Sequence, residues 1–312
     1  MKNIPLILSV LIIFMSCTSN SKRTNTKPDL PENTTSLKLN PHPFIPKLPD
    51  ELRENSGLIY YDGLIWTIND SGGENKIYGF DFKGKIQKEI EIKGAENIDW
   101  EDIAQDEKCI YVGDFGNNYG MRENLKIYRV QKKDIGKKSK QKVDAKEIEF
   151  QYQDQKDFSF QHHTTPYDCE AITELNNSLY LFTKNWKNRT TSVYKLPAKR
   201  GKYKVFSIDS LNVTGLITGA DISPDKTKLV LLGYKNFKPI LWLFTDIKSD
   251  DLFSGTRTFI EMDSINQAQT EGICFLGNDS LLISCEENNY FNHQVFLFNL
   301  NTLEKNGTHS GK

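Results

Sequence analysis

The stretch EDIAQDEKCIYVGDFGNNYGMRENLKIYRV, residues 101–130, contains three short apolar segments separated by polar turns. Segments of this length, rich in Ile, Val and Tyr, are typical of β-strands. The same three-strand pattern occurs five times, at 56–80, 101–130, 170–196, 220–244 and 271–298. A fourth strand-like run follows four of the units, at 86–92, 147–152, 203–208 and 256–262. Repeated four-stranded units of this kind predict a β-propeller.

The last unit has no fourth strand of its own, because the chain becomes polar after Leu303. We expect residues 36–40 to supply that strand, which would join the first and last blades and remove an open sheet edge. The predicted fold is therefore all-β, a propeller of about five four-stranded blades over residues 36–305, followed by a disordered tail at 306–312. The alternative count is six, with a degenerate blade in the insert at 135–165, whose Lys-rich start predicts an exposed loop.

The N-terminus has the pattern of an export signal. A basic start precedes the apolar run from Ile4 to Met15, which is too short to span a bilayer. Phe14-Met15-Ser16-Cys17 resembles a bacterial lipobox, and the resemblance implies a signal peptide at 1–16 with lipid attached to Cys17. An ordinary signal peptide with an incidental cysteine is the alternative. Residues 17–35 are polar and contain proline, so we expect a flexible tether.

The predicted location is thus the bacterial cell envelope, with the protein anchored to a membrane and facing the periplasm. Display on the cell surface is the alternative, although no acidic cluster follows the lipobox cysteine as a sorting signal. The chain has 40 basic and 41 acidic side chains, and this balance argues against a nucleic-acid partner. We expect a monomer that binds a protein or a small molecule.

The cysteines downstream of the lipobox do not predict a metal site. Their spacing matches no zinc pattern and no disulfide framework; they are Cys109, Cys169, Cys274 and Cys285. We expect Cys274 and Cys285 to be buried apolar residues on neighbouring strands. A disulfide between them is the alternative.

Acidic residues recur where the innermost strands begin, and in a propeller these strand starts converge at one mouth of the central channel. Glu101, Glu170 and Glu271 occupy equivalent positions, and Asp102 and Asp221 follow one position later. Carboxylates at a narrow opening raise one another's pKa unless a cation neutralises them. Calcium suits such a site, because it takes about six to eight oxygen ligands. The alternative is architectural, with these side chains accepting hydrogen bonds from backbone N–H groups of the adjacent blade.

The loops after the second strands contain further polar side chains. Asp70 and Asp114 are candidate calcium ligands in two of these loops, and Asp99 lies just before the strand that carries Glu101. Arg122 and Arg189 lie in corresponding loops, where they would pair with acidic side chains or hold an anionic ligand. Many of these residues would equally serve as ordinary turn formers.

Catalytic candidates are few. His163 precedes Asp168, and a histidine near the channel mouth would act as a base near neutral pH. The sequence contains no nucleophile elbow, phosphate-binding loop, dinucleotide fingerprint or HExxH motif. An enzymatic function therefore has no motif to support it.

Part of the chain resembles a group of exported bacterial propeller proteins, often lipoproteins, related to NHL-repeat and SdiA-regulated-type propellers. The resemblance covers about residues 55–130 and rests on Asn69–Gly73, Asp99–Ala104, Val112–Asn118, Arg122 and Ile127–Arg129. Those proteins often have Gly-Asp-Asn where this chain has Gly116-Asn117-Asn118, which removes one possible metal carboxylate. Glu271-Gly272-Ile273 also resembles a strand opening of phytase-like esterase and lactonase propellers, which implies calcium and hydrolysis, but the match is too short to assign catalytic roles.

Two functions are consistent with these patterns. The first is a membrane-anchored binding or interaction scaffold that uses the propeller mouth. The alternative is a calcium-dependent hydrolase of a phosphoester, lactone or ester, in which Glu101, Glu170 and Glu271 would hold the ion.

Overall fold

The computed structural model describes residues 30–248 and 251–303. The predicted signal peptide, Cys17 and the predicted tail at 306–312 lie outside the described residues. No helix in the described part of the chain is long and apolar enough to cross a membrane.

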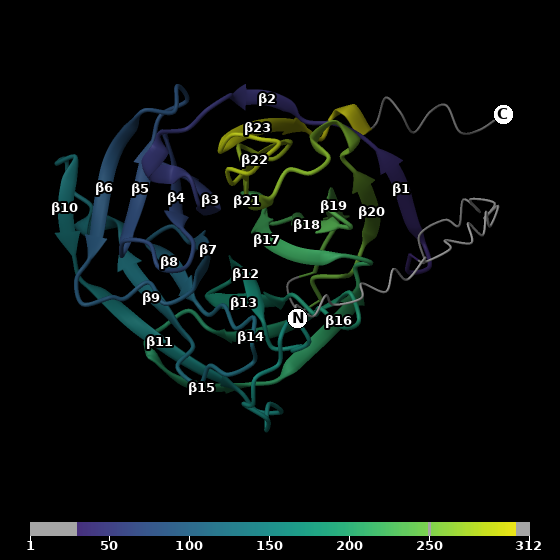
Figure 1. Cartoon of the computed structure of the whole chain (residues 1–312), viewed down its shortest axis with the longest axis horizontal. Coiled ribbons are helices and arrows are strands. Elements are labelled where there is room, and N and C mark those ends of the chain that lie inside the picture. Colours follow the sequence, from purple (N-terminus) through teal and green to yellow (C-terminus); the bar gives the residue numbers. More distant parts are fainter. Residues whose placement is uncertain (1–29, 249–250, 304–312) are drawn as a thin grey trace, which may run out of the picture.

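Five sheets, each with four antiparallel strands, are arranged around a central axis, so the fold is the expected five-bladed β-propeller (Figure 1). From the axis outward, the first blade contains β3 (Asn55–Tyr61), β4 (Leu64–Asn69), β5 (Lys76–Phe80) and β6 (Ile86–Ile92). The second contains β7 (Trp100–Gln105), β8 (Cys109–Asp114), β9 (Lys126–Gln131) and β11 (Ala145–Tyr152). The third contains β12 (Cys169–Leu175), β13 (Ser178–Thr183), β14 (Thr190–Pro197) and β16 (Ser207–Asn212). The fourth contains β17 (Leu216–Ile222), β18 (Lys228–Lys235), β19 (Lys238–Thr245) and β20 (Thr256–Glu261), and the fifth β21 (Thr270–Phe275), β22 (Ser280–Cys285), β23 (Gln294–Asn299) and β2 (His42–Ile45).

Three extra strands lie on the outer rim and pair in parallel with a neighbouring sheet (Figure 1). They are β1 (Thr34–Lys38) on β20, β10 (Lys140–Val143) on β6, and β15 (Gly201–Val205) on β11. Each covers an edge that would otherwise expose unpaired backbone groups. Short 3-10 turns are found at η1 (Asp50–Leu52), η2 (Lys132–Asp134) and η3 (Asp263–Ile265).

The closing strand differs from the expectation. Residues 36–40 do not complete the fifth blade; β2 pairs with β23 instead, and β1 adds to the fourth blade. Burial explains the choice, because Ile45 and the nearby Leu48 and Leu52 are each no more than 2% exposed in the core. The side chains of β1 are mostly exposed and would stabilise the closure less. β1 also begins at Thr34, inside the stretch expected to be a tether.

Two other expectations need correction. The run 203–208 is not one strand, since β15 joins the second blade and β16 becomes the fourth strand of the third blade. Phe206 lies between them and is 60% exposed. The insert at 135–165 holds β10 rather than a sixth blade, while its Lys-rich start at 136–140 is exposed as expected.

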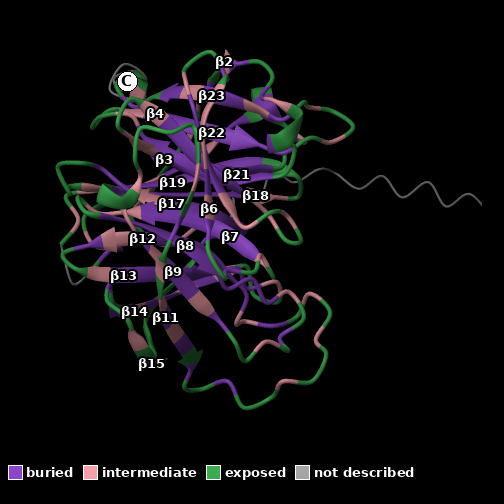
Figure 2. Ribbon diagram, turned by 90° about the vertical axis from the view of Figure 1, so that its left-hand side faces the viewer, coloured by how far each residue is buried: buried purple, intermediate pink, exposed green. Residues whose placement is uncertain are grey.

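The core lies between adjacent sheets, so most strands are buried on both faces (Figure 2). Trp66 of the first blade and Trp100 of the second share one apolar cluster, and Phe182 and Trp242 join the third blade to the fourth. Burying each such side chain contributes roughly 1.5–3 kcal/mol. β8 shows the consequence, since all its residues are buried and its sequence does not alternate.

The cysteines of the described residues are free and buried. Cys274 lies opposite Leu282 in the β21–β22 pair, and Cys285 lies opposite Thr270. The two thiols are therefore out of register with each other, and the alternative of a disulfide is not found.

Candidate functional site

The five innermost strands β3, β7, β12, β17 and β21 pack side by side around the axis and begin at the same end of the channel, which we call the mouth. Glu101, Glu170 and Glu271 lie at the starts of three of them and are 6%, 2% and 9% exposed. Carboxylates this deeply buried require a positive partner or a proton.

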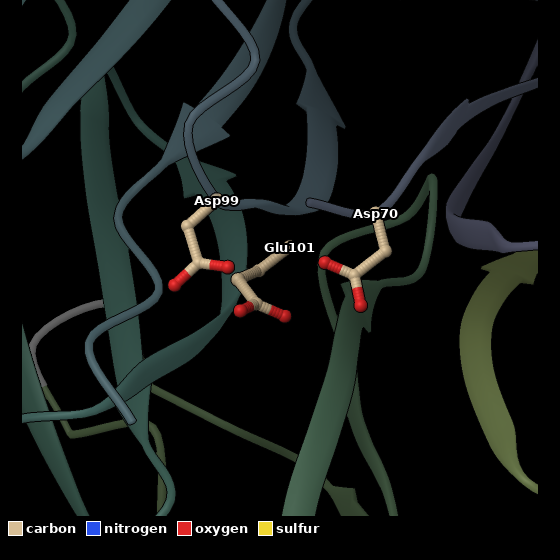
Figure 3. A group of neighbouring side chains, drawn as sticks. All are labelled: Asp70, Asp99 and Glu101. Atoms are coloured by element: carbon tan, nitrogen blue, oxygen red, sulfur yellow. The ribbon is translucent and has the colours of Figure 1, made fainter. Parts of the chain in front are cut away.

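Three acidic side chains converge at the mouth between the first and second blades (Figure 3). Asp70 follows β4, Asp99 precedes β7, and Glu101 lies within β7. One carboxylate oxygen from each lies within 4.8 Å of the others. We call Asp70, Asp99 and Glu101 the carboxylate triad.

The loop after β8 leaves room for this triad. Gly116 lies against it, and a Cβ atom at this position would overlap the carboxylates of Glu101 and Asp99. The Gly116 N–H donates to the carbonyl oxygen of Asp99 at 3.2 Å, which fixes the loop against the strand start. A glycine is required here by close approach rather than by backbone conformation.

Too little positive charge faces the triad. Burial, followed by the negative charge of Asp70, raises the pKa of Asp99 to about 7. Burial and the charge of Glu170 raise the pKa of Glu101 well above its ordinary value, and burial also raises the pKa of Asp70. Protonation or a bound cation would relieve this repulsion.

One buried lysine occupies the centre of the mouth. The Lys184 Nζ lies 2.9 Å from Oε2 of Glu170, and the Lys184 side chain is 8% exposed. Burial opposes its charge, but the carboxylate of Glu170 raises the pKa of Lys184 well above its usual value. Burial raises the pKa of Glu271 to about 7, although the charge of Lys184 acts in the opposite direction.

Lys184 does not satisfy the whole of Glu170. The second oxygen, Oε1, is buried and has no hydrogen-bond partner among the described residues. A buried carboxylate oxygen costs free energy unless a proton, a water or a cation satisfies it.

Asp102 and Asp221 have an architectural role. Asp102 Oδ2 accepts a hydrogen bond from the N–H of Ile172 on β12 at 2.9 Å, and Asp221 Oδ2 accepts one from the N–H of Phe275 on β21 at 2.7 Å. Their other oxygens accept from the N–H of the next residue in the chain. Each oxygen of these two carboxylates has a backbone partner, so they join neighbouring blades in the way that the architectural alternative describes.

The two arginines differ. Arg122 Nη2 lies 2.8 Å from Oδ1 of Asp114, and its Nη1 donates to the carbonyl oxygen of Gly116 at 2.9 Å. Arg122 therefore pairs with an acidic residue, as one alternative expected, and holds the loop that carries Gly116. Asp114 uses Oδ1 for this pair, its buried Oδ2 has no hydrogen-bond partner among the described residues, and the residue lies outside the carboxylate triad. Arg189 is exposed in a turn with φ 57°.

The two catalytic candidates differ, because Asp168 has a hydrogen-bond partner on each oxygen whereas Nδ1 of His163 has none among the described residues. Asp168 is fully buried, with Oδ1 accepting from the N–H of Asn117 at 2.8 Å and Oδ2 from Nε1 of Trp186 at 3.0 Å. His163 packs on Trp186 with ring centroids 4.4 Å apart. Burial and His162 lower the pKa of His163, so it is neutral near pH 7. Asp168 thus holds two loops together through one hydrogen bond on each oxygen.

Sequence reasoning missed Lys184 and Trp186. The signal was present, because a lysine directly after the apolar segment of β13 is placed by the repeat at the mouth. Asp99 was noted but not chosen as a ligand, since its position relative to Asp70 depends on how two loops fold together.

No protein-family model matches this sequence, and no curated protein matches it. Among solved structures, the chain is similar to the PQQ-bound form of aldose sugar dehydrogenase from Streptomyces coelicolor, with 10% identity over 85% of this chain and 95% of that one and a TM-score of 0.47. It is similar to a GH43_1 enzyme from Xanthomonas citri, with 10% identity, 83% and 89% coverage and a TM-score of 0.44. It is similar to the Dos1 propeller, with 10% identity, 79% and 56% coverage and a TM-score of 0.39. Similarities at this level carry no information about ligand or activity.

Proposed function

We propose that this protein is an exported, membrane-anchored binding protein whose propeller mouth holds a calcium ion and presents it to a ligand. Two observations carry the proposal: oxygens of Asp70, Asp99 and Glu101 lie within 4.8 Å of one another, and the buried Oε1 of Glu170 has no partner among the described residues. Both favour a cation at the mouth over a base or a nucleophile.

The donor set suits calcium. All the ligands at the triad are carboxylate oxygens, which hard cations prefer over the nitrogen and sulfur ligands favoured by zinc or copper. The nearest positive side chains already have partners, because Lys184 binds Glu170 and Arg122 binds Asp114. The triad therefore retains the negative charge that a divalent ion would neutralise.

The same mouth would serve the alternative, a calcium-dependent hydrolase in which the ion lowers the pKa of a bound water. Such a reaction also needs a positioned acid or base. Asp168 has both oxygens hydrogen-bonded within the loops that it joins, which favours a structural role for it. His163 has an unpartnered Nδ1, but no hydrogen bond among the described residues orients its ring as a general base, and this supports binding over hydrolysis.

Membrane anchoring is part of the proposal and is supported by the lipobox resemblance at residues 14–17. Expression with a radiolabelled fatty acid tests it. We expect label on the wild-type protein and none on Cys17→Ser, which should leave the membrane fraction. An unlabelled wild-type protein would refute the anchor without affecting the propeller site.

The calcium site is tested by elemental analysis and by melting curves with chelator or with added calcium. We expect calcium to stabilise the protein, and we expect Glu101→Gln to remove that response while the metal-free variant stays folded. If no ion copurifies and calcium leaves the melting temperature unchanged, the proposal is wrong. If Glu101→Gln strongly destabilises the metal-free protein, Glu101 has an architectural role instead.

A further inference from the structure

Exposed apolar side chains gather at the mouth. Six of the nine large hydrophobic side chains that are exposed in the described part of the chain lie in loops at this end of the strands. They are Ile98, Tyr119, Met121, Phe160, Phe237 and Tyr290. Single exposed apolar residues are ordinary, but a group of them around one opening indicates a binding surface.

The strongest part of this group is an aromatic platform formed by Tyr119 and Phe160. Their rings stack with centroids 5.1 Å apart and an angle of 17° between planes, and the residues are 46% and 62% exposed. His163 extends the platform inward, since its ring lies 6.0 Å from Tyr119 and 4.4 Å from Trp186. A continuous row of rings therefore leads from the exposed rim toward the channel.

The loop that carries Tyr119 also contacts the carboxylate triad. Gly116 lies against the carboxylates of Asp99 and Glu101, and Tyr119 is only three residues further along the same loop. Three residues extend at most about 11 Å between Cα atoms. One ligand of modest size can therefore reach both features.

The platform is held in place before any ligand arrives. The Gln161 N–H donates to the carbonyl oxygen of Tyr119 at 2.8 Å, and Nε2 of the buried Gln155 donates to that of Gly120 at 2.8 Å. These bonds join the loop after β8 to the segment before β12. A preformed surface binds with a smaller loss of conformational entropy.

We infer that the ligand of the mouth is a neutral carbohydrate, which stacks a sugar ring on Tyr119 and Phe160 and directs hydroxyl groups to the cation of the triad. This inference rests on the calcium site proposed above. Three carboxylates leave calcium with coordination positions for further oxygen ligands, and neighbouring hydroxyls supply them. Aromatic faces with a few fixed polar groups suit a molecule that is apolar on one face and polar at its edges.

The acidic side chains at the mouth favour neutral carbohydrates over anionic ones. Glu170, Glu271 and Glu286 lie near the triad, and Lys184, the buried lysine beside them, is paired with Glu170. Acidic side chains outnumber the positive groups at the mouth, so an added phosphate or uronic acid finds no unpaired basic side chain there among the described residues. A neutral sugar needs no such partner and still provides oxygen ligands.

Calorimetric titration of the full chain tests the inference. The probes are cellohexaose, maltohexaose and mannohexaose, with hexagalacturonate as the anionic control, each with calcium and with chelator. We expect at least one neutral probe to bind only with calcium, and the anionic probe to bind more weakly. Tyr119→Ala and Phe160→Ala should lower the affinity at least about fivefold while calcium binding is unchanged.

Two control variants test whether the effect comes from the aromatic ring at the mouth. Phe160→Tyr keeps a ring and should keep sugar binding, whereas Phe206→Ala removes a ring of similar exposure that lies outside the mouth loops and should have no effect. If calcium binds and no neutral probe does, the carbohydrate inference is wrong and the calcium site stands. If calcium does not bind at all, the proposed function itself fails. Binding of hexalysine at Tyr119 and Phe160 in place of sugar would overturn the inference in favour of a basic protein partner.

Discussion

Asp99→Asn separates electrostatic repulsion from ligand binding in one experiment. The side chain keeps its shape but loses its charge, within 4.8 Å of the carboxylate oxygens of Asp70 and Glu101. Two charges at this separation repel by about 3 kcal/mol when the effective dielectric constant is about 20. Because the pKa of Asp99 is raised to about 7, most of that charge is present at pH 8.

We therefore expect metal-free Asp99→Asn to be more stable than the metal-free wild type at pH 8, by about 1–3 kcal/mol after solvent and neighbouring groups adjust. The melting temperature should rise by a few degrees, since a protein of this size gains about 2–4 °C per kcal/mol. Calcium at about a hundred times its dissociation constant should stabilise the wild type by about 2.7 kcal/mol and the variant much less.

Differential scanning fluorimetry with and without chelator measures all four states. Asp144→Asn is the matched control, because the Asp144 side chain is 84% exposed and lies on the outer rim, and it should change neither value by more than about 0.5 kcal/mol. If metal-free Asp99→Asn melts below the wild type and calcium still raises its melting temperature by the full wild-type amount, Asp99 is neither repelled by its neighbours nor a calcium ligand. Its carboxylate would then be architectural.

Four further outcomes are expected. Asp102→Ala removes the acceptor of the Ile172 N–H, so it should lower the unfolding free energy by about 2–4 kcal/mol in urea denaturation. The stabilisation by calcium should persist. An unchanged urea midpoint would argue that Asp102 does not hold the second and third blades together. Gly116→Ala places a methyl group against the carboxylates of Asp99 and Glu101, so calcium affinity in a direct titration should fall at least about tenfold. An affinity equal to that of the wild type would contradict the close packing of Gly116 on the triad. Because the pKa values of Asp99 and Glu101 are raised, the folded metal-free protein binds more protons than the unfolded chain. Its stability in melting curves should therefore rise as the pH falls from 8 to 6, while its calcium affinity in titrations should fall. The reverse trends would count against the raised pKa values. Deleting β2 should open the ring and lower the melting temperature far more than deleting β1, and equal effects would argue against the closure.

The blades were predictable because their pattern is local. Each inner three-strand unit carries its own turns and apolar runs, so the repeat is visible without knowledge of tertiary contacts. The strand that closes the ring could not be predicted, because the choice between residues 36–40 and β2 depends on which apolar side chains reach the core. Ile45 and Leu48 do so, and the sequence alone gives no measure of that burial.

The site was predictable in part for the same reason. The repeat places Glu101, Glu170 and Glu271 at equivalent strand starts, and the structure buries all three at one mouth. The strand β7 has a register shift between Trp100 and Asp102, so simple alternation of side chains does not hold at Glu101 and could not separate it from Asp102. What distinguishes Asp102 and Asp221 is that each accepts a backbone hydrogen bond from the adjacent blade, which only the packed structure shows.

The partners of these glutamates could not be read from the repeat. Asp70 and Asp99 come from loops whose meeting depends on the docking of two blades, and Lys184 comes from a third. The Tyr119–Phe160 platform likewise requires two loops to be joined by hydrogen bonds. Contacts between distant loops leave no periodic signal in a sequence.

A crystal grown with calcium, measured at a wavelength where the ion scatters anomalously, would show whether the propeller mouth binds the ion. We expect one anomalous peak at the mouth, from an ion bound by oxygens of Asp70, Asp99 and Glu101 at about 2.3–2.6 Å. A mouth that contains only water or a lysine ammonium group at that position, with calcium plainly in excess, would contradict it.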